Sequence, residues 1–127
     1  MNQEKQRIAI AVACGWRHKE RVFEVGVQIE LGGWYDPDGH FYGEHTSDLP
    51  DYLNSLDAVH EAVGVLTDEQ RAVFRTHLRT IWIRDYNARC GLFPDHDDAI
   101  NATAAQRAES FLKTLGLWTE EEACTKS

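Results

Sequence analysis

Hydrophobic and polar positions alternate with a period of two between Val22 and Leu31, and this pattern predicts a β-strand. The apolar residues Val25, Val27, Ile29 and Leu31 are separated by a glycine, a glutamine and a glutamate. A period of two is typical of a strand with one buried face and one solvated face. We therefore expect one strand over residues 22–31.

A tight turn is predicted shortly after this strand. Asp36-Pro37-Asp38-Gly39 places Asp first, Pro second and Gly last, as a type I turn prefers. Aromatic residues flank the turn on both sides, at Trp34-Tyr35 and Phe41-Tyr42. The pattern predicts a hairpin, so at least part of the sheet is expected to be antiparallel.

Two helices are predicted in the first half of the chain from apolar residues at helical spacing. The first covers residues 2–14 with Asn2 as its cap, although the alternation from Ile8 to Val12 also fits a strand. The second is expected to open between Ser47 and Pro50 and to end at Gly64.

A third helix is predicted after the capping box formed by Thr67 and Gln70, with Leu66 in the staple position. Its predicted apolar face consists of Val73, Phe74, Leu78, Ile81 and Trp82. The run from Ile81 to Tyr86 is β-branched and aromatic, so a change from helix to a short strand there is the alternative.

The closing helix is predicted from Thr103 to Gly116, after a loop at residues 91–98. Thr103 and Gln106 form a second capping box, and Gly116 can take the left-handed position that ends a helix. Leu117 is then expected to contact Leu112.

These elements predict an α/β protein of the α+β type, with a small, mainly antiparallel sheet sandwiched between helices. A length of 127 residues suits one domain. We place the domain at residues 1–118 and expect residues 119–127 to form a polar, frayed tail. No apolar run approaches the ~20 residues of a membrane helix, so no membrane partner is expected.

The three cysteines are too few and too far apart for a disulfide framework or a thiolate metal site. They indicate a reducing cytoplasm. Cys14 is expected in the core and Cys124 in the exposed tail.

Charge is distributed unevenly along the chain. The net charge is −8, and residues 22–70 contain eleven acids and no Lys or Arg. Five arginines follow, at positions 71, 75, 79, 84 and 89, with only Asp85 among them. The overall charge disfavours direct binding of nucleic acid, whereas the arginine band can bind a local anion.

The arginine band supplies the main candidate site. Arg71, Arg75 and Arg79 are four residues apart, so they lie on one stripe of the third helix. Guanidinium groups bind phosphate through paired hydrogen bonds, and nearby aromatic rings can stack on a base. The candidate ligand-binding residues are Arg71, Arg75, Arg79, Arg84, Trp34, Tyr42 and Trp82. An ordinary solvated helix face, or a surface that docks a second subunit, are the alternatives.

The other polar clusters have simpler explanations. Asp57 and His60 (or Glu61) are neighbours on the second helix and could form an acid–base pair, but we interpret them as a helix-surface hydrogen bond with a half-buried histidine. The turns at 36–40 and 95–98 carry carboxylates and a histidine without the bidentate glutamate of an EF-hand, so we interpret them as solvated. No catalytic residue, metal site or cofactor is predicted.

Three blocks of the chain, residues 49–62, 66–70 and 102–118, resemble a known family. They contain a Pro-Asp-Tyr helix with a His-Glu step, and a helix that reads Ala-Thr-Ala-Ala-Gln-Arg-Ala-Glu and ends in Leu-Gly-Leu-Trp. In this order they are similar to the small phage and prophage proteins of the phage ABA sandwich family. The resemblance covers about half of the chain and implies a sheet between helices. It implies no established activity, so no catalytic residue is carried over.

Three functions follow as hypotheses. The first is a phage-encoded, non-enzymatic protein of the host cytoplasm, a homo-oligomer that sequesters a small nucleotide signal of host immunity. The second is an acidic interaction module that inhibits a basic host defence protein or mimics nucleic acid. The third is a small hydrolase with a scattered site that uses Asp57 and His60.

Overall fold

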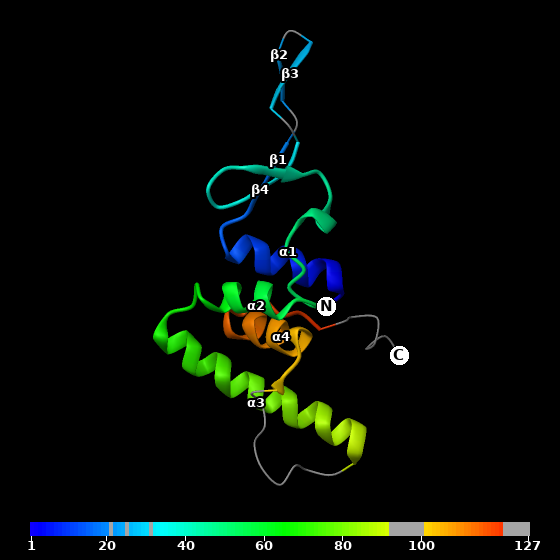
Figure 1. Cartoon of the computed structure of the whole chain (residues 1–127), viewed down its shortest axis with the longest axis vertical. Coiled ribbons are helices and arrows are strands. Elements are labelled where there is room, and N and C mark those ends of the chain that lie inside the picture. Colours follow the sequence, from blue (N-terminus) through cyan, green and yellow to red (C-terminus); the bar gives the residue numbers. More distant parts are fainter. Residues whose placement is uncertain (21, 25, 31, 92–100, 121–127) are drawn as a thin grey trace.

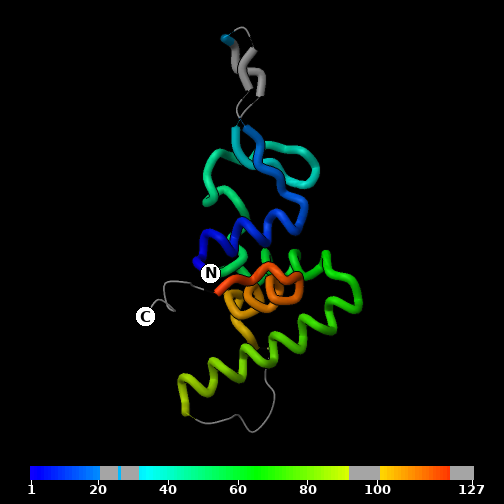
Figure 2. Tube along the Cα trace, turned by 180° about the vertical axis from the view of Figure 1, so that it is seen from behind, coloured from blue at the N-terminus to red at the C-terminus, as the bar shows by residue number. Residues whose placement is uncertain are grey.

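The structure is a computed structural model that describes residues 1–20, 22–24, 26–30, 32–91 and 101–120. Along the chain its elements are α1 (Gln3–Ala13), β1 (Arg17–Lys19), β2 (Val22–Glu24), β3 (Val27–Glu30), β4 (Gly33–Tyr35), β5 (Phe41–Gly43), the 3₁₀ turn η1 (Thr46–Asp48), α2 (Leu56–Val63), α3 (Asp68–Cys90) and α4 (Ala104–Thr114). The predicted α+β class with an antiparallel sheet is confirmed. Both views place the strands at one end of the molecule and all four helices on one side of them, with α1 nearest the sheet and α3 farthest away (Figures 1 and 2).

The sheet of the described residues has three short antiparallel strands in the order β1-β4-β5. His18 pairs with Trp34 between β1 and β4, and Tyr35 pairs with Phe41 between β4 and β5. The predicted hairpin around residues 36–39 is confirmed, and the amide of Gly39 donates to the carbonyl of Asp36 at 2.9 Å.

The prediction of one strand over residues 22–31 is wrong. The segment forms a separate antiparallel hairpin, β2–β3, in which Glu24 pairs with Val27. Gly26 lies between the two strands with φ of 77°, a left-handed conformation that glycine adopts without steric cost. Two paired strands show the same period of two as one long strand. The alternation alone therefore did not reveal that the chain reverses direction between β2 and β3.

The predicted start of the second helix is also wrong. Ser47 lies in η1, and α2 begins only after Ser55, whose hydroxyl accepts from the amide of Ala58. Arg7 ties this segment to α1, because its guanidinium donates to the carbonyls of Ser47 and Pro50, at 3.3 Å and 2.9 Å.

The other helices have the predicted positions. Asn2 caps α1, and both predicted capping boxes are present, at Thr67–Gln70 of α3 and Thr103–Gln106 of α4. The helix α3 continues unbroken to Cys90, so the alternative of a strand at residues 81–86 is wrong. At the end of α4 Gly116 has φ of 72°, the predicted left-handed conformation, and the amide of Leu117 donates to the carbonyl of Leu112 at 2.8 Å.

The core lies among the four helices and is covered at one end by the sheet. Ile10, Val59, Phe111 and Leu112 have no solvent exposure, while Val73 of the predicted apolar face is 46% exposed. Cys14 is half-buried and packs against this core, as predicted, whereas Cys124 lies outside the described residues. No helix in the described part of the chain is long and apolar enough to cross a bilayer.

Candidate functional site

The structure does not bring all the predicted ligand-binding residues together. The four arginines and Trp82 belong to α3, whereas Trp34 and Tyr42 belong to β4 and β5. Figure 1 places α3 and the sheet at opposite ends of the molecule, with α1, α2 and α4 between them. Trp34 and Tyr42 therefore cannot stack on a ligand that the arginines hold.

Arg84 and Arg71 of this set make structural contacts. Arg84 forms a bidentate pair with Glu109 of α4, with Nη1–Oε2 and Nη2–Oε1 distances of 2.8 and 3.1 Å. Arg71 donates to the carbonyl of Gly64 at 3.0 Å and so ties α3 to the end of α2. Arg75 and Arg79 are exposed, and Arg75 makes no hydrogen bond or ion pair within the part of the chain that the structure describes.

Glu109 is the centre of a polar network that sequence reasoning missed. Its carboxylate is 11% exposed and also accepts from Lys113 at 2.8 Å. Burial alone would raise the pKa of Glu109, but hydrogen bonds from Arg84 and Lys113 lower it overall. The spacing of Glu109 and Lys113, four residues apart on one helix, was the only local signal for this network.

A prediction for pH follows from this network. Because the folded-state pKa of Glu109 is lowered, its stabilisation is complete above the ordinary carboxyl pKa of 4.5 and is lost as pH falls below it. We expect Glu109→Gln to lower the free energy of unfolding by about 1–2 kcal/mol at pH 7, and we expect this difference from the wild type to shrink as pH falls below 4.5. Urea unfolding at pH 7, 5, 4 and 3 measures this convergence.

The matched control is Glu20→Gln, which removes an exposed carboxylate that has no ion pair among the described residues. Its difference from the wild type should stay near zero at every pH. A Glu109→Gln deficit that persists unchanged at pH 3 would show that packing, and not the charge, stabilises the network.

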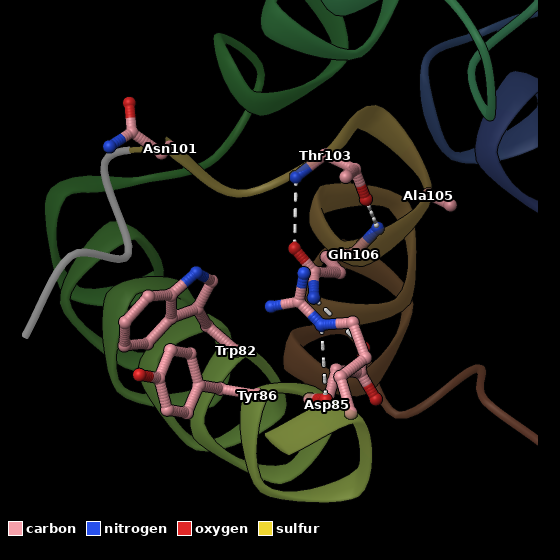
Figure 3. Close-up of a pocket in the computed structure, with 8 residues that line it drawn as sticks. Trp82, Asp85, Tyr86, Asn101, Thr103, Ala105 and Gln106 are labelled. Atoms are coloured by element: carbon pink, nitrogen blue, oxygen red, sulfur yellow. Dashed lines mark hydrogen bonds between the residues drawn. The ribbon is translucent and has the colours of Figure 1, made fainter. Parts of the chain in front are cut away.

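A cavity lies beside this network, between the second half of α3 and the start of α4. It has a volume of about 560 Å³ and is lined by Trp82, Asp85, Tyr86, Arg89, Asn101, Thr103, Ala105 and Gln106. The rings of Trp82 and Tyr86 lie side by side, with centroids 5.5 Å apart and planes tilted by 36°. Figure 3 shows these rings along one wall and the hydrogen-bonded chain of Thr103, Gln106 and Asp85 along the other.

The polar wall has a defined hydrogen-bond arrangement. Gln106 accepts from the amide of Thr103 at 2.9 Å and donates to Asp85 at 2.9 Å. Burial would raise the pKa of Asp85, but hydrogen bonds from Arg84 and Gln106 lower it overall, so the carboxylate is ionised at neutral pH. Each carboxylate oxygen has a second lone pair, so Asp85 can still accept a hydrogen bond from a ligand.

Arg89 adds a positive charge at this cavity. Its guanidinium carbon lies 5.8 Å from the centre of the Tyr86 ring, and its Nε donates to the carbonyl of Asp85 at 3.4 Å. Within the described part of the chain no other hydrogen bond of Arg89 is seen, so its terminal nitrogens can bind an anion. The sequence showed Arg89 as part of the arginine band, but only the structure places it beside an aromatic pair.

The remaining predicted clusters do not form a catalytic arrangement within the described residues. Asp57, His60 and Glu61 are exposed on α2, and no side-chain hydrogen bond joins them to one another. Asp36, Asp38 and His40 have potential ligand atoms within 4.8 Å of each other. The carboxylate of Asp36, however, already accepts from the amides of Asp38 and His40, at 2.9 and 2.8 Å. The cluster at 95–98 lies outside the described residues.

Comparison with known protein families, with curated proteins and with solved structures finds no match to this chain. The resemblance to phage ABA sandwich proteins therefore stays a prediction.

Proposed function

We propose that this protein is a non-catalytic binding protein that sequesters a small nucleotide-derived anion in the cavity between α3 and α4. The observation that supports this proposal is the combination of an aromatic wall, an ionised hydrogen-bond acceptor and a guanidinium group in one cavity of about 560 Å³. Ligand sites of this size typically combine apolar walls with a few placed polar groups. For a phage-encoded protein in the host cytoplasm, the biological role would be to withdraw a nucleotide signal of host immunity.

Each part of the cavity matches one part of a nucleotide. The rings of Trp82 and Tyr86 offer a surface on which a base can stack. The Asp85 carboxylate can accept hydrogen bonds from the amino or imino groups of a base. The Arg89 guanidinium can hold a phosphate.

Isothermal titration tests the proposal with a panel of cyclic dinucleotides, cyclic trinucleotides and cyclic ADP-ribose isomers. We expect at least one member to bind, and we expect Tyr86→Ala and Arg89→Ala each to weaken that binding by about tenfold or more. One stacked base or one charge-assisted phosphate contact contributes about 1–3 kcal/mol, and 1.4 kcal/mol corresponds to a factor of ten.

Arg17→Ala is the matched control, because Arg17 is an exposed arginine of β1 at the opposite end of the molecule. It makes the same change in charge as Arg89→Ala and should leave the affinity unchanged. The proposal fails if no member of the panel binds, or if the three variants lose affinity equally.

The acidic interaction module remains the second candidate function. Several acids of residues 22–70 are used inside the structure, such as Asp48, which accepts from the amide of His45, and Asp51, which accepts from the side chain of Asn54. Others, including Asp38 and Glu61, are exposed and line one cavity near the sheet. A salt-sensitive pull-down of a basic protein that is lost in Asp38→Asn Glu61→Gln would support this candidate over the first.

A further inference from the structure

A second cavity, at the sheet end of the molecule, has the opposite charge character. It has a volume of about 380 Å³ and is formed by the turn after β4, by β5, and by residues around α1 and α2. The lining residues are Cys14, Trp16, Asp36, Pro37, Asp38, Tyr42, Pro50, Tyr52, Glu61, Ala62 and Val65. Three of these residues are acids and three are aromatic, whereas none is Lys or Arg.

The floor of this cavity is aromatic and uncharged. Trp16, Tyr52 and Ala62 are buried, and Trp16 packs edge-on against Tyr42 with ring centroids 4.8 Å apart. Burial raises the pKa of both the Tyr52 hydroxyl and the Cys14 thiol. Both groups therefore stay protonated at neutral pH and contribute no charge to the floor.

The mouth of the cavity carries negative charge from two different parts of the chain. Asp38 belongs to the hairpin turn and Glu61 to α2, and both are exposed beside Tyr42, which is itself 56% exposed. Neither carboxylate makes a hydrogen bond or ion pair with any residue that the structure describes. Glu61 lines the same cavity as Tyr52 and Cys14.

We propose that this cavity binds an organic cation, an alkylammonium or guanidinium group, between Asp38 and Glu61 and against the rings of Trp16 and Tyr42. A cation near an aromatic face is attracted by the charge distribution of the ring, and two uncompensated carboxylates add to this attraction. The volume and the aromatic walls suit a carbon-bearing cation better than a metal ion. This site is separate from the α3–α4 cavity, so the inference does not depend on the proposed nucleotide ligand.

NMR titration of the ¹⁵N-labelled protein with n-butylammonium chloride and n-butylguanidinium chloride tests the proposal at low ionic strength. We expect saturable shifts of the backbone amides of Trp16, Tyr42 and Glu61 with at least one of the two cations. The uncharged analogue n-butanol should not produce these shifts. Glu61→Gln, Asp38→Asn and Tyr42→Ala should each weaken the binding by about two- to fivefold.

Glu69→Gln is the matched control, because Glu69 is an exposed acid in the first turn of α3 and does not line this cavity. It should leave the affinity unchanged. The proposal is overturned if neither cation gives saturable shifts, if n-butanol gives the same shifts, or if the double variant Asp38→Asn Glu61→Gln binds like the wild type.

Two further titrations identify the source of the cation. Tighter binding of spermidine than of a tetralysine peptide would assign the site to free polyamines. Tighter binding of the peptide would assign it to a basic segment of a partner protein, in agreement with the second candidate function. Both results support a site for organic cations.

Discussion

Phe111→Ala is expected to lower the free energy of unfolding by about 3–5 kcal/mol. Phe111 has no solvent exposure and lies on α4, the helix that contacts α1, α2 and α3. Removal of its ring leaves a cavity at the point where these helices meet, and neighbouring residues refill such a cavity only in part. Since small domains are stable by only about 5–15 kcal/mol, this loss is a large fraction of the total.

Urea unfolding followed by circular dichroism measures the effect as a lower midpoint at an unchanged slope. Val73→Ala is the matched control, because it also truncates an apolar side chain on a helix but at a position that is 46% exposed. We expect the control to cost less than about 1 kcal/mol. Equal losses in the two variants would contradict the central position that the structure gives to Phe111.

The helix boundaries set by local chemistry could be predicted from the sequence. A capping box needs only a Thr and a Gln three residues apart, and both capping boxes are present where this spacing predicted them. The end of α4 around Gly116 is also set by a local contact, the hydrogen bond from the amide of Leu117 to the carbonyl of Leu112, five residues earlier. Such features depend on the chain near the helix end and little on the rest of the fold.

Boundaries set by distant contacts could not be predicted in this way. The segment before α2 is held by Arg7 of α1, about forty residues away, which donates to the carbonyls of Ser47 and Pro50. The division of residues 22–31 into two strands depends on the pairing of those strands with each other. A hydrophobic pattern contains neither kind of contact.

The candidate site also combines features set by local sequence with features set by distant contacts. The arginine stripe was predicted from helical spacing, and the structure places Arg71, Arg75 and Arg79 on α3 as expected. The partner of Arg84 is Glu109, 25 residues later, so no residue near Arg84 in the chain indicated that it forms a structural ion pair. The aromatic partners were also misjudged, because the distance between the sheet and α3 is a property of the whole fold.

Gly33→Ala is expected to cost about 3 kcal/mol or more in the free energy of unfolding and to disrupt the pairing of β4 with β5. Gly33 has φ of 144°, and a Cβ placed there would lie 2.3 Å from the carbonyl oxygen of Gly43 on the neighbouring strand. The clash is with backbone, so it cannot be relieved by rotation of a side chain. Backbone strain contributes about 1–3 kcal/mol, and overpacking contributes a similar amount.

Gly39→Ala separates these two costs, because Gly39 also has a positive φ, of 93°, but a Cβ there would have no neighbour within 4 Å. The control should therefore show the backbone strain alone, about 1–3 kcal/mol. Urea unfolding of both variants measures their free energies of unfolding, and the difference between them is the cost of the clash. The amide shifts of Trp34 and Phe41 report the pairing of β4 with β5. If Gly33→Ala is no less stable than Gly39→Ala, then β4 and β5 do not approach as closely as the structure shows. A larger loss of unfolding free energy in Gly33→Ala than in Gly39→Ala would instead support the close approach of Gly33 and Gly43. These two strands lie at the end of the molecule where the proposed cation site lies.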